Sequence, residues 1–126
     1  VIAKMFPYEL EITRDRVTVE EAPVEILDKT STLLNYPNKI TSKDFENWIQ
    51  ERGIYFAGKR DAVWVSPIAM NDPGESSSDG SVVLAKHGQG NLVYTGLSFF
   101  RELPTGVVGA YRLLVNMIEI PQNNKK

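Results

Sequence analysis

The chain reads GQGNLVYTGLSFFRELPTGVVGAYRLL from Gly88 to Leu114, and this stretch decides the fold. Its first glycines predict a turn, and the apolar residues of 91–95 predict a buried strand. Arg101 and Glu102 then form an abrupt charged pair in an apolar context. A mostly apolar helix is expected over Val107–Ile118. We therefore expect the charged pair to lie at the C-terminal end of a central strand, where ligands bind in α/β sheets.

Four further segments are typical of strands. Tyr8–Val19 predicts one bent strand or a hairpin, with Arg14-Asp15-Arg16 as its turn, and Pro23–Leu27 predicts a second strand. Ala62–Met70 is interrupted by Pro67, which suits an edge strand or a bend. Ser81–Lys86 is expected to form a hairpin with residues 91–95, while Asp72–Gly80 predicts a Ser-rich loop.

The segment Thr41–Arg52 predicts a helix. Thr41 can accept a backbone N–H bond at the start of the helix, and Asp44 lies three residues on, near the positive end of the helix dipole. Phe45, Trp48, Ile49 and Arg52 follow at helical spacing, and Gly53 is a typical C-terminal stop. The fold class is therefore α/β, with a central mixed sheet of about five or six strands flanked by this helix and by Val107–Ile118.

The composition bounds the domain count and the partners. The 126 residues indicate a single domain over 1–120, with 121–126 as a disordered tail. Sixteen acidic and fourteen basic residues give a net charge of −2 without a basic face, which argues against nucleic acid as a partner. No apolar run approaches the ~20 residues of a membrane span, so a membrane partner is not expected. The compartment stays open, with a slight preference for a periplasmic or extracytoplasmic one.

The residue types also limit the chemistry. The absence of cysteine excludes disulfides, thiolate catalysis and Cys-ligated zinc, and His87 is the only histidine. Gly88-Gln89-Gly90 lies between two strands, whereas phosphate loops open a helix, so a hairpin turn is favoured. We therefore predict no metal, no cofactor and no catalytic residue. Candidate carboxylates for glycoside hydrolysis are Asp44, Glu46, Glu51 and Glu102, with solvated helix faces as the default interpretation.

The charged pair Arg101 and Glu102 allows a structural and a functional interpretation. A structural interpretation pairs Arg101 with Glu51 or Glu102 to fix the loop before the last helix. A functional interpretation makes the pair part of a ligand or partner-domain contact, which aromatic and planar polar groups would join. The candidate ligand or interface residues are Trp48, Glu51, Arg52, Tyr55, Arg101, Glu102 and Tyr111, with Gln50 nearby.

Several blocks of the sequence resemble a known family. They are Pro37–Ile40, Asp44–Phe56, Met70–Glu75 and the opening Gly88–Leu114 stretch. Together they resemble the C-terminal region of large bacterial PIG-L/LmbE-type deacetylases, which is similar to class I glutamine amidotransferase domains and to their ThuA-like relatives. The resemblance extends from about Arg14 to Ile118.

The resemblance implies a partial, flavodoxin-like amidotransferase domain, with Val1 lying partway into it. The deacetylase chemistry of such proteins belongs to a separate N-terminal zinc domain with a His-Pro-Asp-Asp type motif, and amidotransferase activity needs a cysteine nucleophile. This chain has neither the motif nor the cysteine. No catalytic residue can therefore be transferred to it.

Three functions remain as hypotheses. The preferred one is a non-catalytic accessory domain of a deacetylase or related carbohydrate-active protein, whose partners are the enzyme domain of the same parent chain and a glycan-like ligand. The second is a degenerate hydrolase that uses carboxylates without a metal. The third is a structural module that forms homo-oligomers, which an exposed apolar patch would favour.

Overall fold

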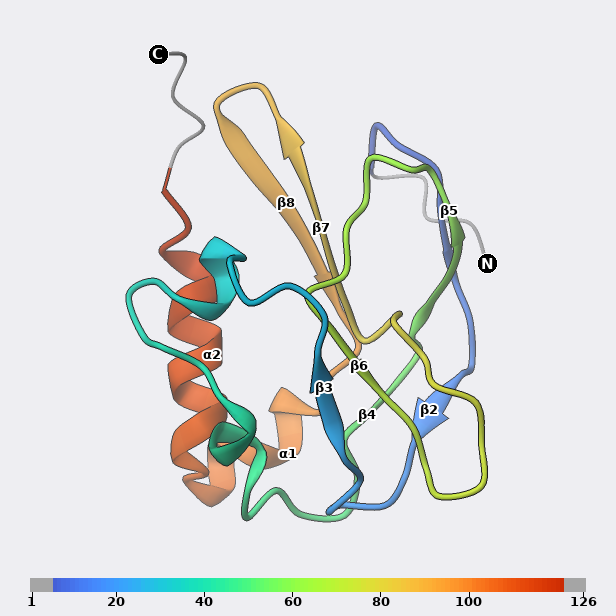
Figure 1. Cartoon of the computed structure of the whole chain (residues 1–126), viewed down its shortest axis with the longest axis vertical. Helices are drawn as coiled ribbons and strands as arrows, with labels where there is room; N and C mark the ends of the chain where they lie inside the picture. The colour runs from blue at the N-terminus through green and yellow to red at the C-terminus, as the bar shows by residue number, and fades with distance from the viewer. Residues whose placement is uncertain (1–5, 122–126) are drawn as a thin grey trace.

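The structure is a mixed α/β arrangement of short antiparallel strand pairs and two C-terminal helices (Figure 1). It is a computed structural model that describes residues 6–121. The strands are β1 (Leu10–Ile12), β2 (Arg16–Val17), β3 (Val24–Ile26), β4 (Gly53–Ile54), β5 (Ala57–Arg60), β6 (Ile68–Met70), β7 (Val82–His87) and β8 (Gly90–Thr95). Two 3₁₀ turns, η1 (Thr32–Leu34) and η2 (Ser42–Phe45), precede the helices α1 (Phe99–Thr105) and α2 (Val108–Ile118).

The strands pair as β1 with β5, β2 with β4, β3 with β6, and β7 with β8. Each pair is antiparallel, and residues 6–121 contain no parallel pair, so the expected central mixed sheet is not formed within them. Of the two alternatives for Tyr8–Val19, the hairpin is wrong and the bent strand is confirmed. β1 and β2 run in succession along strands more than thirty residues later, since β1 pairs with β5, β2 pairs with β4, and Thr13 and Asp15 between them bond the backbone of Phe56.

The β7–β8 hairpin confirms the prediction for Ser81–Lys86 and residues 91–95. Its register runs from Val82 opposite Thr95 to His87 opposite Gly90, and Gly88 supplies the positive φ of 59° that the tight turn requires. One face contributes Leu84 and Val93 to the main core. The other face packs in a second cluster with Leu10 and Trp64. The hairpin therefore separates two apolar clusters, as expected of a buried strand pair.

The helix predicted over Thr41–Arg52 is wrong. The capping box between Thr41 and Asp44 is present, but only the 3₁₀ turn Ser42–Phe45 follows it. Asn47 and Gln50 then have positive φ of 68° and 66°, which a right-handed helix excludes. The carbonyls of the first turn are instead taken by side chains, since Trp48 donates its indole N–H to Asp44 and Arg52 donates to Phe45. Tertiary hydrogen bonds thus replace the helical ones.

The charged pair Arg101 and Glu102 lies in helix α1, not at the end of a central strand. β8 ends at Thr95, and the chain turns at Gly96 and Leu97 before α1 begins. Gly106 ends α1 in the left-handed conformation, with φ of 85°. The last helix is confirmed as α2.

Helix α2 packs across the chain segment that contains η1 and η2. Asn116 is fully buried on its inner face, donating to the carbonyls of Leu33 and Asn38 and accepting the backbone N–H of Asn38. Both the nitrogen and the oxygen of the buried Asn116 side-chain amide therefore have hydrogen-bond partners. Helix α2 is therefore held against this segment by buried hydrogen bonds as well as by apolar packing. Of the tail predicted over 121–126, residues 122–126 lie outside the described part.

Gly109 marks the closest approach of α2 to η2. A Cβ at this position would overlap the backbone carbonyl of Asp44, which no side-chain movement can relieve. We expect Gly109→Ala to lower the free energy of unfolding by about 2–4 kcal/mol, because the helix must shift away from the turn. Urea unfolding followed by circular dichroism measures it.

The matched control is Gly90→Ala, where the added Cβ would meet only the carbonyl of His87, at 3.8 Å. Its free energy of unfolding should change by less than about 1 kcal/mol. Equal effects of the two substitutions would show that the contact between α2 and η2 is not a packing constraint.

Candidate functional site

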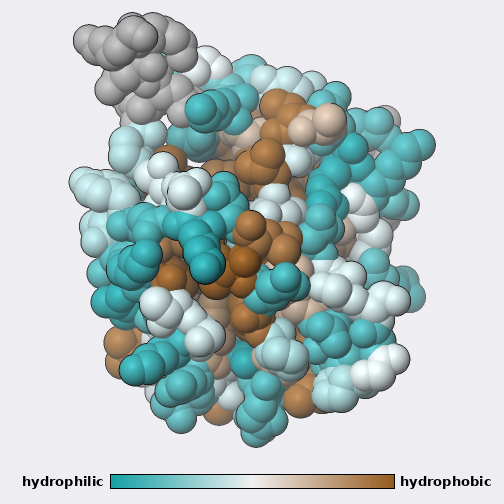
Figure 2. Space-filling model, in the orientation of Figure 1, coloured by the Kyte–Doolittle hydropathy of each residue, from teal (hydrophilic) through white to brown (hydrophobic). Residues whose placement is uncertain are grey.

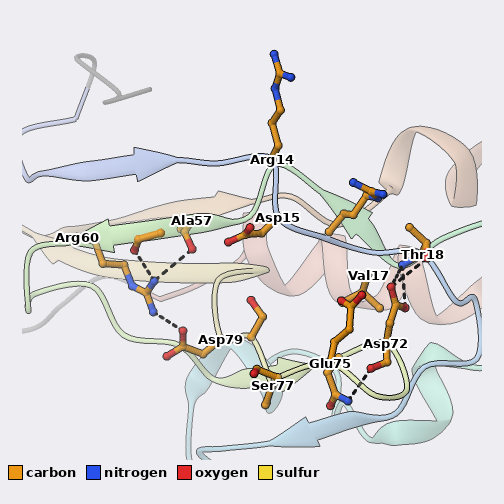
Figure 3. A pocket seen from close by; sticks show the side chains of 15 residues that line it. Arg14, Asp15, Val17, Thr18, Ala57, Arg60, Asp72, Glu75, Ser77 and Asp79 are labelled. Atoms are coloured by element: carbon orange, nitrogen blue, oxygen red, sulfur yellow. Dashed lines mark hydrogen bonds and ion pairs between the residues drawn. The ribbon is translucent and has the colours of Figure 1, made fainter.

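A polar pocket of about 630 Å³ lies on the side of β2 and β5 (Figure 3). One wall is the chain from Arg14 to Thr18, a second is the start of β5, and the third is the loop that follows β6. The lining residues are Arg14, Asp15, Arg16, Val17, Thr18, Ala57, Gly58, Arg60, Asn71, Asp72, Glu75, Ser76, Ser77, Ser78 and Asp79. None of them is aromatic, so the pocket offers hydrogen-bonding groups rather than an apolar surface.

Arg60 joins the β5 wall to the loop wall. Its guanidinium forms an ion pair of 2.8 Å with Asp79 and donates to the carbonyl of Gly58 and to the hydroxyl of Ser66. Ser66 in turn donates to the carbonyl of Asp79. The Arg60 side chain is largely covered, whereas that of Asp79 is more than half exposed. This pair therefore shapes the wall and leaves part of the Asp79 carboxylate facing solvent.

Asp72 joins the loop wall to the β2 wall. Its carboxylate accepts the backbone N–H groups of Thr18 and Val19 and the Thr18 hydroxyl, at 2.8–3.0 Å. Burial alone would raise the pKa of Asp72, but these hydrogen bonds and the nearby charge of Arg16 outweigh it and hold the pKa below its ordinary value. Asp72 is thus an ionised structural brace at one end of the pocket.

Two further carboxylates, those of Asp15 and Glu75, line the pocket. The carboxylates of Asp15 and Glu75 make no hydrogen bond with other residues of the described part, 6–121, and both residues are exposed. In Figure 3, Asp15 and Ser77 lie on different walls of the hollow, while Arg14 extends away from it. The pocket therefore presents two free carboxylates and a row of serine hydroxyls in a framework fixed by Arg60 and Asp72.

The residues predicted from sequence lie elsewhere, around the start of α1. Three of them, Trp48, Arg52 and Glu102, are buried in the interior. Arg52 donates to the carbonyls of Ala22 and Phe45, and its guanidinium carbon lies 6.0 Å from the centre of the Trp48 ring. Burial lowers the pKa of Arg52, and the negative charge of Glu102 partly opposes that shift.

Glu102 is bound from two directions. Its carboxylate accepts the backbone N–H of Ile49 at 2.8 Å and the hydroxyl of Ser98 at 2.8 Å. Glu51 pairs instead with Arg101, whose Nε lies 2.6 Å from the Glu51 carboxylate. Both carboxylates are therefore held by protein groups, and of the two partners that the structural interpretation gave Arg101, Glu51 or Glu102, the structure has Glu51.

The two tyrosines of the predicted set are on the surface. Tyr55 is about half exposed, with a positive φ of 63°, and its carbonyl accepts the hydroxyl of Tyr94. Tyr111 is also about half exposed, and its hydroxyl donates to the carbonyl of Leu103. His87 is exposed beside the hairpin turn, where its Nδ1 lies 3.1 Å from the hydroxyl of Tyr8. The predicted set is thus divided between the interior and the surface.

The polar pocket was not identified from the sequence. The sequence predicts a turn at Arg14-Asp15-Arg16 and a loop at Asp72–Gly80, and both carry the charged or Ser-rich composition that a polar pocket needs. This composition is the available signal, but the two segments are more than fifty residues apart, and tertiary hydrogen bonds such as those of Asp72 with Thr18 and Val19 bring them together.

Comparisons with protein-family models, with curated proteins and with solved structures found no match. Within residues 6–121, no helix is long and apolar enough to cross a membrane. The same part of the chain contains no group of three or more His, Cys, Asp or Glu side chains placed to hold a metal ion. The geometry of the pocket is therefore the main structural guide to function.

The Asp72 brace predicts a pH dependence of stability. Because its pKa is lowered in the folded state, the carboxylate stabilises the fold above its unfolded value of about 3.8 and loses this effect as the pH falls through the folded value. We expect Asp72→Asn to lower the free energy of unfolding by about 1–3 kcal/mol at pH 7. The difference from the natural chain should shrink below about pH 4.

Thermal and urea unfolding of both proteins between pH 3 and pH 7 measures this difference. Glu119→Gln is a suitable control, since Glu119 is an exposed carboxylate outside the pocket. A difference between the Asp72 variant and the natural chain that does not change with pH would contradict an ionised brace.

Proposed function

We propose that this chain is a non-catalytic accessory domain of a PIG-L/LmbE-type deacetylase or a related carbohydrate-active protein. In this role it supports the enzyme domain of its parent chain and helps to hold a glycan-like ligand. The resemblance of the sequence blocks to such proteins supports the proposal. On the same resemblance, we propose that the fold is a part of a flavodoxin-like, class I glutamine amidotransferase-like domain.

The polar pocket is the observation that carries the ligand-holding role. Sugars present many hydroxyl groups, each of which can donate and accept a hydrogen bond, and they require a site in which donors and acceptors alternate. The free carboxylates of Asp15 and Glu75 are acceptors, while Asn71 and the serines between Glu75 and Asp79 supply donors. The framework of Arg60 and Asp72 holds these groups before a ligand arrives, which reduces the entropic cost of binding.

The missing aromatic surface restricts the ligand. Without an aromatic side chain among the lining residues, the apolar face of a pyranose ring has nothing to stack on. Binding then depends on hydrogen bonds in an open, hydrated site, where each contributes modestly. We therefore expect weak binding, which suits a domain that holds a substrate for another domain rather than one that binds it alone.

The test is a titration of the chain with neutral, acidic and amino oligosaccharides. Binding is measured by the chemical shifts of the backbone amides of the chain. The amides of residues 14–18 and 71–79 should shift on binding. Asp15→Asn and Glu75→Gln should each weaken binding about three- to tenfold, because each removes a charged acceptor. Neither should alter thermal stability, since both side chains are exposed.

Glu119→Gln, at an exposed site outside the pocket, is the control and should leave binding unchanged. No sugar-dependent shift in the pocket amides at millimolar concentration would refute the ligand-holding role. Deacetylase or glutaminase turnover by the purified chain alone would refute the non-catalytic assignment.

A structural module that forms homo-oligomers is the second candidate. It is favoured by an exposed apolar stripe on α2, where Val108, Tyr111, Val115 and Ile118 are 40–70% exposed. Their spacing places them along one side of the helix. Exposed apolar side chains grouped in this way are typical of interaction surfaces.

This candidate predicts a concentration-dependent dimer in sedimentation analysis. Ile118→Glu should shift such a dimer to monomer, because a charge would be buried in the interface, and should leave the fold intact because Ile118 is 70% exposed. Lys59→Glu, an exposed charge reversal on β5, should have no effect on the assembly. A monomer at all concentrations would exclude the oligomer module.

A further inference from the structure

Strand β3 has one paired edge and one open edge. Glu25 lies opposite Ala69 of β6, and the N–H of Leu27 donates to Pro67 on the same side. Because successive residues of a strand direct their N–H and C=O groups to opposite edges, those of Val24 and Ile26 point away from β6. In the described part of the chain these four backbone groups have no hydrogen-bond partner. β3 is therefore an edge strand with free donors and acceptors.

An apolar groove runs along this open edge. It has a volume of about 420 Å³, and its lining residues are Val24, Ile26, Lys29, Leu34, Asn35, Lys39, Ile40, Thr41 and Ser42. Figure 1 shows that β3 lies between β6 on one side and the chain of η1, η2 and α2 on the other. Figure 2 shows apolar side chains gathered in a hollow in the middle of the same face. An unpaired strand edge and an apolar hollow thus coincide.

The charges at the groove are of one sign. Lys29 and Lys39 are exposed and are the only ionisable residues among those that line it. Glu25 lies between Val24 and Ile26 on β3, so its side chain points to the other face of the strand, away from the groove. A segment that enters the groove therefore meets free peptide groups, apolar side chains and two positive charges.

We propose that this groove binds an extended segment of a different polypeptide, which adds to β3 as a further strand. Peptides that add to a sheet edge gain affinity from main-chain hydrogen bonds and specificity from alternate side chains. The occupant has apolar residues at every second position, facing Leu34 and Ile40, and acidic residues that meet Lys29 and Lys39. The groove is separate from the polar pocket, so this proposal does not depend on the ligand-holding role proposed for that pocket.

A second copy of the chain is a poorer occupant. In a two-fold antiparallel pairing of β3 with itself that is centred on the strand, Glu25 would lie directly opposite Glu25 of the other copy. The lysines that border each groove would also approach each other. Like charges opposed across a strand pair are destabilising, so the charge pattern favours an acidic partner of different sequence.

The first experiment titrates the full chain with a blocked synthetic peptide of sequence Asp-Val-Thr-Val-Thr-Ile-Asp. Binding is followed by the chemical shifts of the backbone amides of Val24 and Ile26. Two N-methylated versions are compared, one methylated on the Val and Ile amides and the other on the Thr amides. Only one set faces β3 when the peptide is a paired strand. One version should therefore lose binding, whereas the other should stay within about threefold of the parent peptide.

The second experiment changes the protein. Ile26→Pro removes the outward N–H without removing a bond to β6 and should weaken binding about tenfold, whereas Ile26→Val should retain it. Lys29→Glu should weaken binding of the Asp-flanked peptide several-fold and favour a Lys-flanked one, and Lys59→Glu should do neither. If the proline variant does not fold, the N-methylated peptides test the same hydrogen bonds in the natural chain.

Three results would overturn the proposal. Equal behaviour of the two N-methylated peptides would mean apolar adhesion without strand pairing. A dimer of the natural chain that Ile26→Pro abolishes would make a second copy the occupant. No binding of the Asp-flanked peptide at millimolar concentration would show that the edge does not accept a strand.

Discussion

The buried guanidinium of Arg52 is the group on which the rest of the arrangement depends. It donates to the carbonyls of Ala22, before β3, and Phe45, at the end of η2, while the Arg52 backbone bonds Val17 of β2 and Ser98 at the start of α1. A buried charge is costly unless its donors are satisfied, so the segments that carry Ala22 and Phe45 must pack where their carbonyls accept from it. The fully buried Glu102 completes the arrangement from α1 by fixing the backbone at Ile49.

The two candidate sites lie at the edges of the molecule. The charged groups of Arg52 and Glu102 are bound by protein partners, and a pocket of about 470 Å³ beside them is lined in part by Trp48 and Arg52. The polar pocket forms where β2 and β5 meet the loop after β6, and the apolar groove forms where β3 has no second neighbour. Both are consequences of short strand pairs that do not join into one continuous sheet.

Local patterns predicted the elements whose stability is local. The β7–β8 hairpin needs only a glycine turn and adjacent strands, and α2 needs only an apolar periodicity, so both are recognisable in the sequence. The predicted helix over Thr41–Arg52 failed although its capping box formed, because carbonyls that would continue the helix accept side-chain donors from Trp48 and Arg52. Intrinsic helix propensity is small compared with the cost of leaving a buried guanidinium without acceptors.

The sequence by itself determined the mixed α/β class, the terminal hairpin and helix, and two alternative partners for Arg101, Glu51 or Glu102, of which the structure has Glu51. Only the tertiary structure decided that Trp48, Arg52 and Glu102 are interior, and that Arg14–Thr18 meets Asp72–Asp79 to form a polar pocket. The physical reason is distance along the chain. A hairpin turn or a helical face is specified within a few residues, whereas the acceptors of a buried charge and the walls of a pocket come from segments that only the whole fold brings together.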